Sequence, residues 1–578
     1  MHNSQLLTGG DVLAATLAKA GVKDIFTLHG GHLDGLFKAC KDLDINLFDT
    51  RHEASAGHAA EAYARVKGDL GVCVVTSGPG FTNVISSIVN AKSDQTPVLY
   101  IVGAPPLREA HTNPLQGGFD QIAMATPGAK LALRITHAER IADQLALAIR
   151  EARNAPYGPV LVEVPIDVMH MLVHPDDLTA PTGLAVQCRP APSRRDLNRI
   201  VEQLKKAKRP ALIVGGSVRY SHCGELLSQV ALKFALPVFS NAGGRGILRN
   251  DHPLHFADPG LIATLDEAHK PDLIINLGAR SGMFLGGRSK AIVGDQAFYI
   301  QVHNDPAELG RVNEASLALN CDYGELLASL YEENFKPAIE EGWVDALRAA
   351  RHALAHPAYP ADSGGAVHPG QAVAQIVQSS GENALFVIEG GETGLWALDG
   401  VEVNRPGHVL SYGYLGCLGT GPGFALGAAI ASPDSRVVLI SGDGAFGFHL
   451  QELDSMNRHH TPVINVVLNN ECWGMSIHGQ EMLYGKGYSA VSRLGGLSYA
   501  AIGGGFGCHA EQVTRLEDLA PAMARAIASG KPAVIEVMTD PQVVHPVMHL
   551  MLSEPADPSR EIVIPYYENI PLRDLSQR

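Results

Sequence analysis

Short apolar runs alternate along the chain with longer segments in which Ala and Leu recur at helical spacing. Gly or Pro bounds most of these runs. Continuous apolar strands between helices are typical of parallel sheets that are covered on both faces. The pattern therefore predicts an α/β protein of doubly wound parallel sheets. The clearest predicted strands are Val72–Thr76, Val98–Val102, Val160–Val164, Ala211–Val214, Leu273–Leu277, Leu385–Ile388, Arg436–Ile440, Val463–Leu468 and Ala533–Val537.

This alternation breaks at two Pro-rich segments without periodicity, His174–Pro192 and His356–Pro369. Such segments are typical of linkers between domains. A chain of 578 residues is also long enough for about three domains. We therefore predict three α/β domains and a polar tail. Their bounds are 1–173, 193–355 and 370–550, with the tail at 551–578.

Composition and charge exclude several classes of protein. Hydrophobic residues make up 46% of the chain and charged residues 18%, and the formal net charge is −15. This acidic balance argues against a nucleic-acid-binding protein, which normally clusters Lys and Arg. The eight cysteines are scattered singly, and no apolar run is long enough to cross a membrane. We expect reduced thiols, no membrane partner and a soluble cytoplasmic protein.

The most informative segment joins the predicted strand Arg436–Ile440 to Ser441-Gly442-Asp443-Gly444-Ala445. Gly442 and Gly444 allow a sharp turn that presents amide N–H groups to a phosphate at the start of a helix, which we predict to continue through Met456. A second apolar strand then ends at Asn470. Asp443, the Asn470 amide oxygen and the backbone carbonyl of Cys472 are hard oxygen ligands suited to Mg²⁺. The segment therefore predicts a diphosphate held through a cation.

This combination resembles the motif of thiamine diphosphate (ThDP) enzymes. The resemblance implies ThDP and Mg²⁺ as cofactors. It also implies that the first domain binds the pyrimidine ring, that the second is the central domain of the family and that the third binds the diphosphate. Asp443, Asn470 and the Cys472 carbonyl would hold the metal. The cofactor-binding residues would be Gly391, Gly416, Leu418, Gly442, Asp443, Gly444, Ala445 and Asn470.

The family also requires an activating acid near the N-terminus, and Glu53 fits that role. Glu53 opens a helix of small residues that can pack closely against a neighbour with the carboxyl turned inward. Burial raises the pKa of a carboxyl, which suits it to share a proton with a ring nitrogen. The resemblance implies that Glu53 bonds the pyrimidine N1′. Glu61, on the same helix, is expected to be a solvated carboxylate.

The loop Thr76–Asn83 follows the strand at Val72 and opens another helix. By the same resemblance it packs at a subunit interface. Family members place the activating Glu and the diphosphate site on different subunits. The resemblance therefore implies a homodimer with shared active sites, and a homotetramer of two such dimers.

Further motifs resemble benzaldehyde lyase, which makes and cleaves 2-hydroxy ketones. They are Leu28–Asp34, Asp49–Glu53, Gly80–Asn83, Thr112–Gln116, Tyr412–Gly419 and Asn469–Gly474. The resemblance implies that His32 assists proton transfer at the substrate hydroxyl and that Gln116 hydrogen-bonds the bound adduct. Leu418 would be the apolar wedge under the cofactor, and the Gly416 carbonyl would accept from its N4′ amine.

Two positions depart from the lyase. Ile166 and Gly394 stand where the lyase carries aromatic residues. Together with Gly31, Gly394 is expected to leave room for substrate. The departures predict a wider pocket that accepts aliphatic or longer acyl donors.

The middle domain contains two Gly-rich segments, Gly243–Gly246 and Leu277–Gly282. Neither fits the strand–GxGxxG–helix pattern of a dinucleotide site. We interpret both as turns at strand ends and do not predict a bound FAD.

Three functions remain open. The first is a lyase and carboligase that forms and cleaves 2-hydroxy ketones from aldehydes. The second is decarboxylation of a 2-keto acid with ligation, as in acetolactate synthase, or cleavage of a 2-hydroxyacyl-CoA. The third is a non-catalytic ThDP-binding protein, which the presence of Glu53, Asp443 and Asn470 disfavours.

Overall fold

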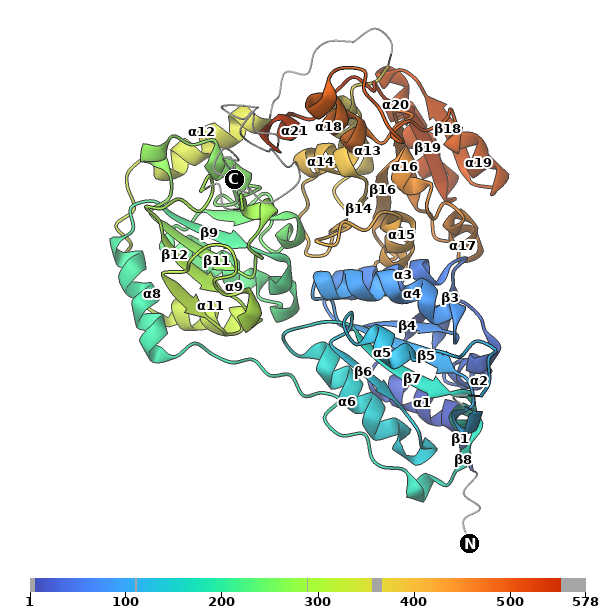
Figure 1. Cartoon of the computed structure of the whole chain (residues 1–578). Helices are drawn as coiled ribbons and strands as arrows, with labels where there is room; N and C mark the ends of the chain where they lie inside the picture. The colour runs from blue at the N-terminus through green and yellow to red at the C-terminus, as the bar shows by residue number, and fades with distance from the viewer. Residues whose placement is uncertain (1–5, 110–111, 288–289, 356–365, 552–578) are drawn as a thin grey trace, which may run out of the picture.

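The computed structural model describes residues 6–109, 112–287, 290–355 and 366–551. They form three α/β domains, each built on a parallel sheet (Figure 1). The second predicted linker lies mostly outside the described residues, as does the predicted tail from residue 552 onward.

The N-terminal domain contains a six-stranded sheet in the order β3-β2-β4-β5-β7-β6. Its strands are β2 (Asp24–Thr27), β3 (Asn46–Asp49), β4 (Gly71–Val75), β5 (Val98–Ala104), β6 (Leu131–Arg134) and β7 (Val160–Pro165). Its helices are α1 (Gly9–Lys19), α2 (Asp34–Asp42), α3 (Glu53–Lys67), α4 (Pro79–Ser93), α5 (Gln121–Ala125), α6 (Ile141–Arg153) and α7 (Ile166–His170). The short strands β1 (Leu7–Thr8) and β8 (Leu172–Val173) pair antiparallel and tie the two ends of this domain together.

The central domain contains a five-stranded sheet in the order β10-β9-β11-β12-β13. Its strands are β9 (Pro210–Val214), β10 (Val238–Ser240), β11 (Leu273–Leu277), β12 (Phe298–Val302) and β13 (Leu317–Leu319). Its helices are α8 (Arg194–Lys206), α9 (Gly224–Phe234), α10 (Gly260–Ala263), α11 (Tyr323–Glu332) and α12 (Trp343–Ala355). The Gly-rich segments follow β10 and β11, which confirms them as turns at strand ends.

The C-terminal domain contains a six-stranded sheet in the order β15-β14-β16-β17-β19-β18. Its strands are β14 (Ala384–Ile388), β15 (Val409–Ser411), β16 (Arg436–Gly442), β17 (Ile464–Asn469), β18 (His509–Val513) and β19 (Ala533–Met538). Its helices are α13 (Pro369–Ser380), α14 (Gly391–Gly400), α15 (Thr420–Ala431), α16 (Asp443–Phe446), α17 (Glu452–Arg458), α18 (Gly474–Tyr484), α19 (Tyr499–Gly505), α20 (Leu516–Ser529) and α21 (Pro546–Met551).

The predicted apolar runs all form central or next-to-edge strands. For example, Val72 pairs with Leu99, and both side chains are buried. Helices cover both faces of each sheet, so these strands can be apolar throughout. The predicted α/β class with three doubly wound parallel sheets is confirmed.

The outer domains meet where α3 packs against α15 (Figure 1). Small residues allow this close approach. A Cβ at Gly423 would lie 2.9 Å from the Ser55 carbonyl oxygen, and one at Gly427 would overlap the Ala59 carbonyl. This helix pair makes the largest contact between the two domains, and the ion pair of Arg458 with Asp49 adds to it. None of the described helices is long and apolar enough to cross a membrane.

Candidate active site

A cavity of about 370 Å³ lies in the C-terminal domain, where β14, β16 and β17 end. Ligands bind at this edge of open parallel sheets, and the volume falls in the range of small-molecule sites. The cavity is lined by every cofactor and metal residue that the sequence suggested. These are Gly391, Gly416, Leu418, Gly442, Asp443, Gly444, Ala445, Asn470 and Cys472.

Four helices begin at the wall of this cavity: α13 at Pro369, α14 at Gly391, α16 at Asp443 and α18 at Gly474. The free N–H groups of helix N-termini favour an anion. The prediction of one continuous helix through Met456 is wrong, because α16 ends at Phe446 and α17 begins at Glu452. A four-residue helix has little dipole, so the longer helices that begin at this wall are expected to contribute more to the binding of an anion.

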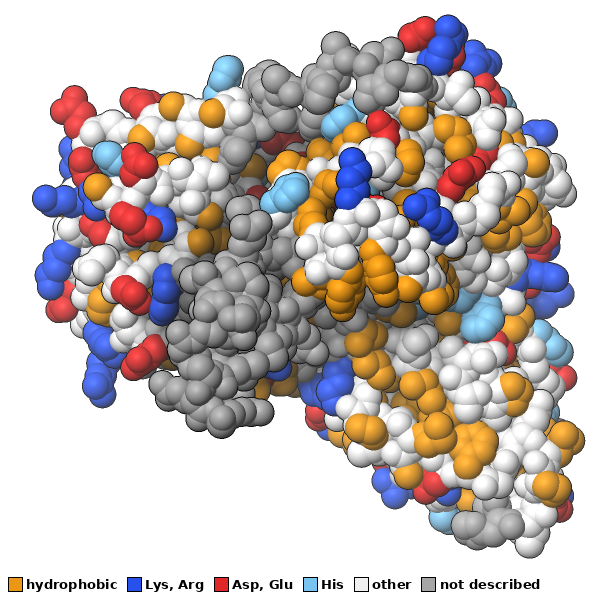
Figure 2. All heavy atoms as spheres, turned by 45° about the horizontal axis from the view of Figure 1, so that its top comes forward, with side chains coloured by type: hydrophobic (Ala, Val, Ile, Leu, Met, Phe, Trp, Pro, Cys, Tyr) orange, Lys and Arg blue, Asp and Glu red, His pale blue; other side chains and the backbone are white. Residues whose placement is uncertain are grey.

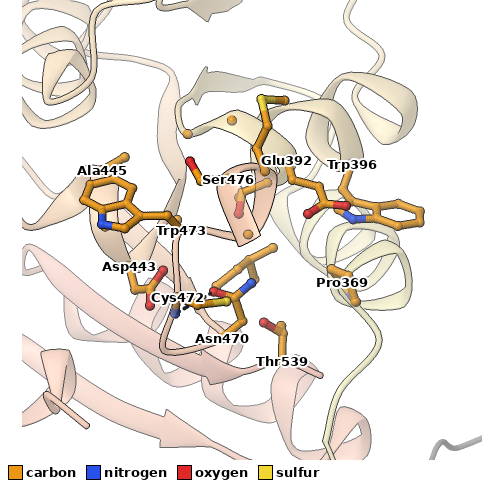
Figure 3. Close-up of a pocket in the computed structure, with 18 of the residues that line it drawn as sticks. Pro369, Glu392, Trp396, Asp443, Ala445, Asn470, Cys472, Trp473, Ser476 and Thr539 are labelled. Carbon is orange, nitrogen blue, oxygen red and sulfur yellow. Dashed lines mark hydrogen bonds between the residues drawn. The ribbon is translucent and has the colours of Figure 1, made fainter. Parts of the chain in front are cut away.

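The predicted metal ligands converge in this cavity (Figure 3). Asp443 is 3% exposed, and burial raises its pKa to about 7 although the backbone N–H groups of Gly444 and Glu471 oppose the shift. Asn470 Oδ1 lies 3.3 Å from the Cys472 amide, which donates to it. One carboxylate with an amide oxygen and a backbone carbonyl suits a hard cation such as Mg²⁺.

No group of three or more His, Cys, Asp or Glu side chains that could hold a metal occurs among the described residues. A metal in the cavity would therefore rely on the amide and carbonyl oxygens beside Asp443. Gly444 also shapes the cradle, because a Cβ there would lie 2.5 Å from the Trp473 ring. The residues present thus fit a diphosphate bound with a divalent cation.

Gly416 lies at the middle of the loop between β15 and α15. Its φ of +68° is in the left-handed region, and a Cβ there would meet nothing within 4 Å. No side chain therefore covers the backbone at this point. Gly416 and Leu418 both line the cavity.

The three predicted catalytic residues gather in the N-terminal domain around the loop after β4. Glu53 opens α3, is 7% exposed and accepts a hydrogen bond of 2.9 Å from the Asn83 amide. His32 Nδ1 lies 3.2 Å from Thr76 Oγ1, and burial lowers the pKa of its ring. Gln116 has a φ of +55°, and its carbonyl accepts a 2.6 Å hydrogen bond from the Ser77 hydroxyl.

Sequence reasoning missed Gln121, whose side chain hydrogen-bonds the loop after β4. Gln121 is 3% exposed. Its Oε1 accepts from the Gly78 N–H at 2.9 Å, and its Nε2 donates at 3.0 Å to both the Gly103 carbonyl and the Glu163 carboxylate. No periodicity or motif marks a lone Gln at the start of a five-residue helix.

Sequence reasoning also missed Glu392, which lines the cavity and is 6% exposed. Its carboxylate bonds His478 Nδ1 at 2.6 Å and accepts from the His545 backbone N–H. Burial lowers the pKa of His478, but the Glu392 partner outweighs this and leaves the pKa raised. Glu392 thereby joins α14 and α18 to the segment before α21.

The catalytic set and the cavity belong to different domains. The cavity lining runs from Pro369 to Val543, so Glu53, His32 and Gln116 are not part of it. Gln116 instead lines a small cavity of about 30 Å³ beside Gln121 and Glu163.

Two expectations are corrected. Glu61 was expected in solvent but is fully buried. Its carboxylate is compensated there by an ion pair with Arg65 and by a hydrogen bond of 2.9 Å from the Asn90 amide. A Cβ at Gly394 would lie 3.2 Å from the Tyr412 ring. Tyr412 thus fills the space that Gly394 was expected to open, whereas Gly31 has nothing within 4 Å of its Cβ position.

The fold and this cavity define a thiamine diphosphate enzyme, and comparison with known proteins agrees. Three models described as thiamine pyrophosphate enzyme domains match the chain. These are the N-terminal TPP binding domain over residues 7–124, the central domain over 197–330 and the C-terminal TPP binding domain over 389–537. The chain belongs to the thiamine pyrophosphate (diphosphate) enzyme family.

Curated relatives cover 80% or more of the chain. A probable acetolactate synthase of Mycobacterium bovis is 33% identical over 550 residues, which are 94% of this chain and 98% of the relative. The 2-hydroxyacyl-CoA lyase 2 of Homo sapiens is 31% identical over 517 residues, 80% of this chain and 79% of the relative. An acetolactate synthase large subunit of Corynebacterium glutamicum is 29% identical, covering 92% and 86%.

Proposed function

We propose that the protein is a ThDP- and Mg²⁺-dependent lyase and carboligase. It would join two aldehydes into a 2-hydroxy ketone and cleave such ketones back to aldehydes. The observation that carries this proposal is the grouping of His32, Thr76 and Gln116 beside Glu53. When bound, ThDP supplies a carbanion equivalent that attacks a carbonyl carbon. The chain must then move protons at the substrate hydroxyl.

His32 suits that task. With Nδ1 engaged by Thr76, Nε2 is the ring nitrogen that can face a substrate. A pKa lowered by burial keeps the ring neutral near pH 7, so Nε2 can take the hydroxyl proton during cleavage and return it during ligation. Gln116 provides an amide that can orient the substrate oxygen. Glu53, held by Asn83, is the acid that would bond the cofactor's pyrimidine ring.

In the same proposal, Asp443, Asn470 and the Cys472 carbonyl would hold Mg²⁺ beside the diphosphate. We further propose a homodimer in which the N-terminal set of one subunit completes the C-terminal cavity of the other, and two such dimers in a tetramer. Exposed apolar side chains support such an interface. They occur in both domains and include Leu115 at 74%, Phe119 at 40%, Leu415 at 42% and Phe448 at 53% exposed.

The distribution of hydrophobic side chains over the surface also supports this interface. Hydrophobic side chains gather on the N-terminal and C-terminal domains in Figure 2, whereas the central domain shows mainly charged and polar ones. On the face that Figure 2 shows, the two domains that carry the site thus offer apolar surface to a second subunit.

A substrate screen tests the proposed reaction. The full chain with ThDP and Mg²⁺ is incubated with benzaldehyde or short aliphatic aldehydes, and the 2-hydroxy ketone is measured by chromatography. We expect ligation and the reverse cleavage, and we expect His32→Ala to lower both while ThDP binding stays unchanged. The relatives supply the competing outcomes. CO₂ release from pyruvate without ligation of aldehydes would favour an acetolactate synthase-like enzyme, and aldehyde release from a 2-hydroxyacyl thioester would favour a 2-hydroxyacyl-CoA lyase.

A further inference from the structure

The loop Tyr412–Gly419, which we name the cofactor loop, carries Gly416 and Leu418 into the wall of the ThDP cavity. It joins β15 to α15, but its first half is held by residues of the other two domains. These contacts are independent of the proposed reaction, because they concern only how the cofactor is bound.

Arg65 of α3 makes the first contact. Its Nη1 donates to the Ser411 carbonyl at 2.9 Å, immediately before the loop begins. Its guanidinium also lies 5.1 Å from the centre of the Phe424 ring on α15, the helix that follows the loop. A single side chain of the N-terminal domain thus touches the elements on both sides of the cofactor loop.

Asp94, at the end of α4, makes the second contact. Its Oδ1 accepts from the Tyr414 N–H at 3.3 Å, and a Cβ at Gly413 would overlap its carboxylate. Gly413 has a φ of +75°, so the chain turns tightly around the carboxylate. Only Gly permits both this approach and this backbone conformation without strain.

Buried charges fix the positions of Arg65 and Asp94. Arg65 Nη2 lies 2.6 Å from Asp94 Oδ2 and also pairs with Glu61, one turn earlier on α3. The guanidinium has a planar fork of donors, which allows it to hold two carboxylates and a carbonyl in one arrangement. Arg280 of the central domain adds a third point, because its guanidinium lies 4.8 Å from the centre of the Tyr414 ring.

We propose that the Glu61–Arg65–Asp94 network is a positioning device that sets the cofactor loop, so that side chains of the N-terminal domain determine ThDP affinity in the C-terminal domain of the same chain. The network touches only the first half of the loop and does not line the cavity. Its residues are therefore positioning residues rather than catalytic ones.

Two variants test the network. Arg65→Lys keeps the charge but replaces the fork by a point charge that cannot hold Glu61, Asp94 and the Ser411 carbonyl together. Asp94→Asn removes the negative charge that pairs with Arg65 and weakens the acceptor for the Tyr414 N–H beside the Gly413 turn. Asp69→Asn is the matched control, because it breaks an ion pair with Arg153 in the same domain, away from the loop.

The dissociation constant of ThDP is measured at fixed Mg²⁺ by quenching of tryptophan fluorescence, since Trp396 and Trp473 line the cavity. Each apoprotein is titrated below its own unfolding temperature, which is measured separately. We expect the dissociation constant to rise about tenfold in Arg65→Lys and Asp94→Asn, the effect of losing a charged hydrogen bond, and to stay unchanged in Asp69→Asn.

A purely structural network would lower the unfolding temperature and leave the dissociation constant of ThDP at the wild-type value. That result in Asp94→Asn overturns the proposal, even where Arg65→Lys does not fold. Failure of the aldehyde screen leaves the proposal standing, because the titration needs no substrate.

Discussion

The N-terminal and C-terminal domains use one design for two tasks. Both sheets place their strands in the same order relative to the chain, and the turns at corresponding strand ends match. Ser77-Gly78-Pro79-Gly80 follows β4, and Ser441-Gly442-Asp443-Gly444 stands at the end of β16. Where one turn carries Pro79, the other carries the proposed metal ligand Asp443.

A second pair of turns repeats this contrast. His29-Gly30-Gly31-His32 follows the first strand of the N-terminal sheet, and Glu389-Gly390-Gly391-Glu392 follows the first strand of the C-terminal sheet. The N-terminal turn presents an imidazole, whereas the C-terminal turn opens α14 at the cavity and buries Glu392 against His478. The shared fold thus supplies the sheet edge, and we propose that single residues in the turns decide whether this edge serves proton transfer or anion binding.

The largest expected effect comes from removing the acid of the N-terminal set. Glu53→Gln keeps the shape of the side chain but cannot share a proton with the cofactor. We expect kcat to fall about 10³-fold, within the range typical of acid–base groups, and exchange of the cofactor C2 proton to slow with it. Both are measured with saturating ThDP and Mg²⁺. Glu202→Gln, on the exposed face of α8, is the control, and full exchange in Glu53→Gln would refute the role of Glu53.

The matching change in the C-terminal domain is Asp443→Asn, which removes the only carboxylate of the proposed metal set. We expect Mg²⁺ and ThDP to bind at least about 100-fold more weakly, because loss of a residue that only supports a metal ligand can already cost about that much. Titrations followed by tryptophan fluorescence measure this, with the exposed Asp434→Asn as control. Unchanged Mg²⁺ affinity would show that the cation lies elsewhere.

The affinity for Mg²⁺ should depend on pH through Asp443 of the C-terminal domain. Burial raises the pKa of Asp443 to about 7, so below pH 7 the carboxyl takes up a proton that Mg²⁺ must displace. Affinity should therefore fall by about tenfold per pH unit as the pH drops below 7 and level off above it. Titrations between pH 5.5 and 8 test this. Asp443→Asn should remove the slope, and a slope that persists in this variant would point to another group.

The smallest effect concerns the glycines that were expected to open the substrate pocket. Because Tyr412 fills the space beside Gly394, Gly394→Ala should change the ratio of aromatic to aliphatic aldehyde turnover by less than about twofold, the cost of a slight ring shift. Gly31→Ala places a methyl in open space beside His32 and should change that ratio more. The reverse order would show that Gly394 borders the substrate.

Much of this architecture could be predicted from the sequence because it rests on local patterns. Apolar strands buried on both faces, such as Val98–Val102, stand out without knowledge of their neighbours. The turn at Asp443 and the small residues after Glu53 were likewise readable, since turn chemistry and close helix packing leave traces in adjacent residues.

Features that depend on distant partners could not be predicted. Glu61 was expected in solvent because its partner Asn90 comes from another helix. The space beside Gly394 is filled by Tyr412, which follows the next strand. The end of α16 at Phe446 was missed, although Gly447 disfavours a helix. Gln121 is defined entirely by contacts with three separate strand ends.

The most direct test of the central claim, a site shared by two subunits, is complementation between Glu53→Gln and Asp443→Asn. The two inactive proteins are mixed, dissociated and reassembled, and aldehyde ligation is measured against the wild type. In a shared site, each mixed dimer contains one site with both lesions and one intact site. Random assembly should then restore about a quarter of wild-type activity. If the two sets act within one chain, every site keeps one lesion, and the mixture stays as inactive as its components.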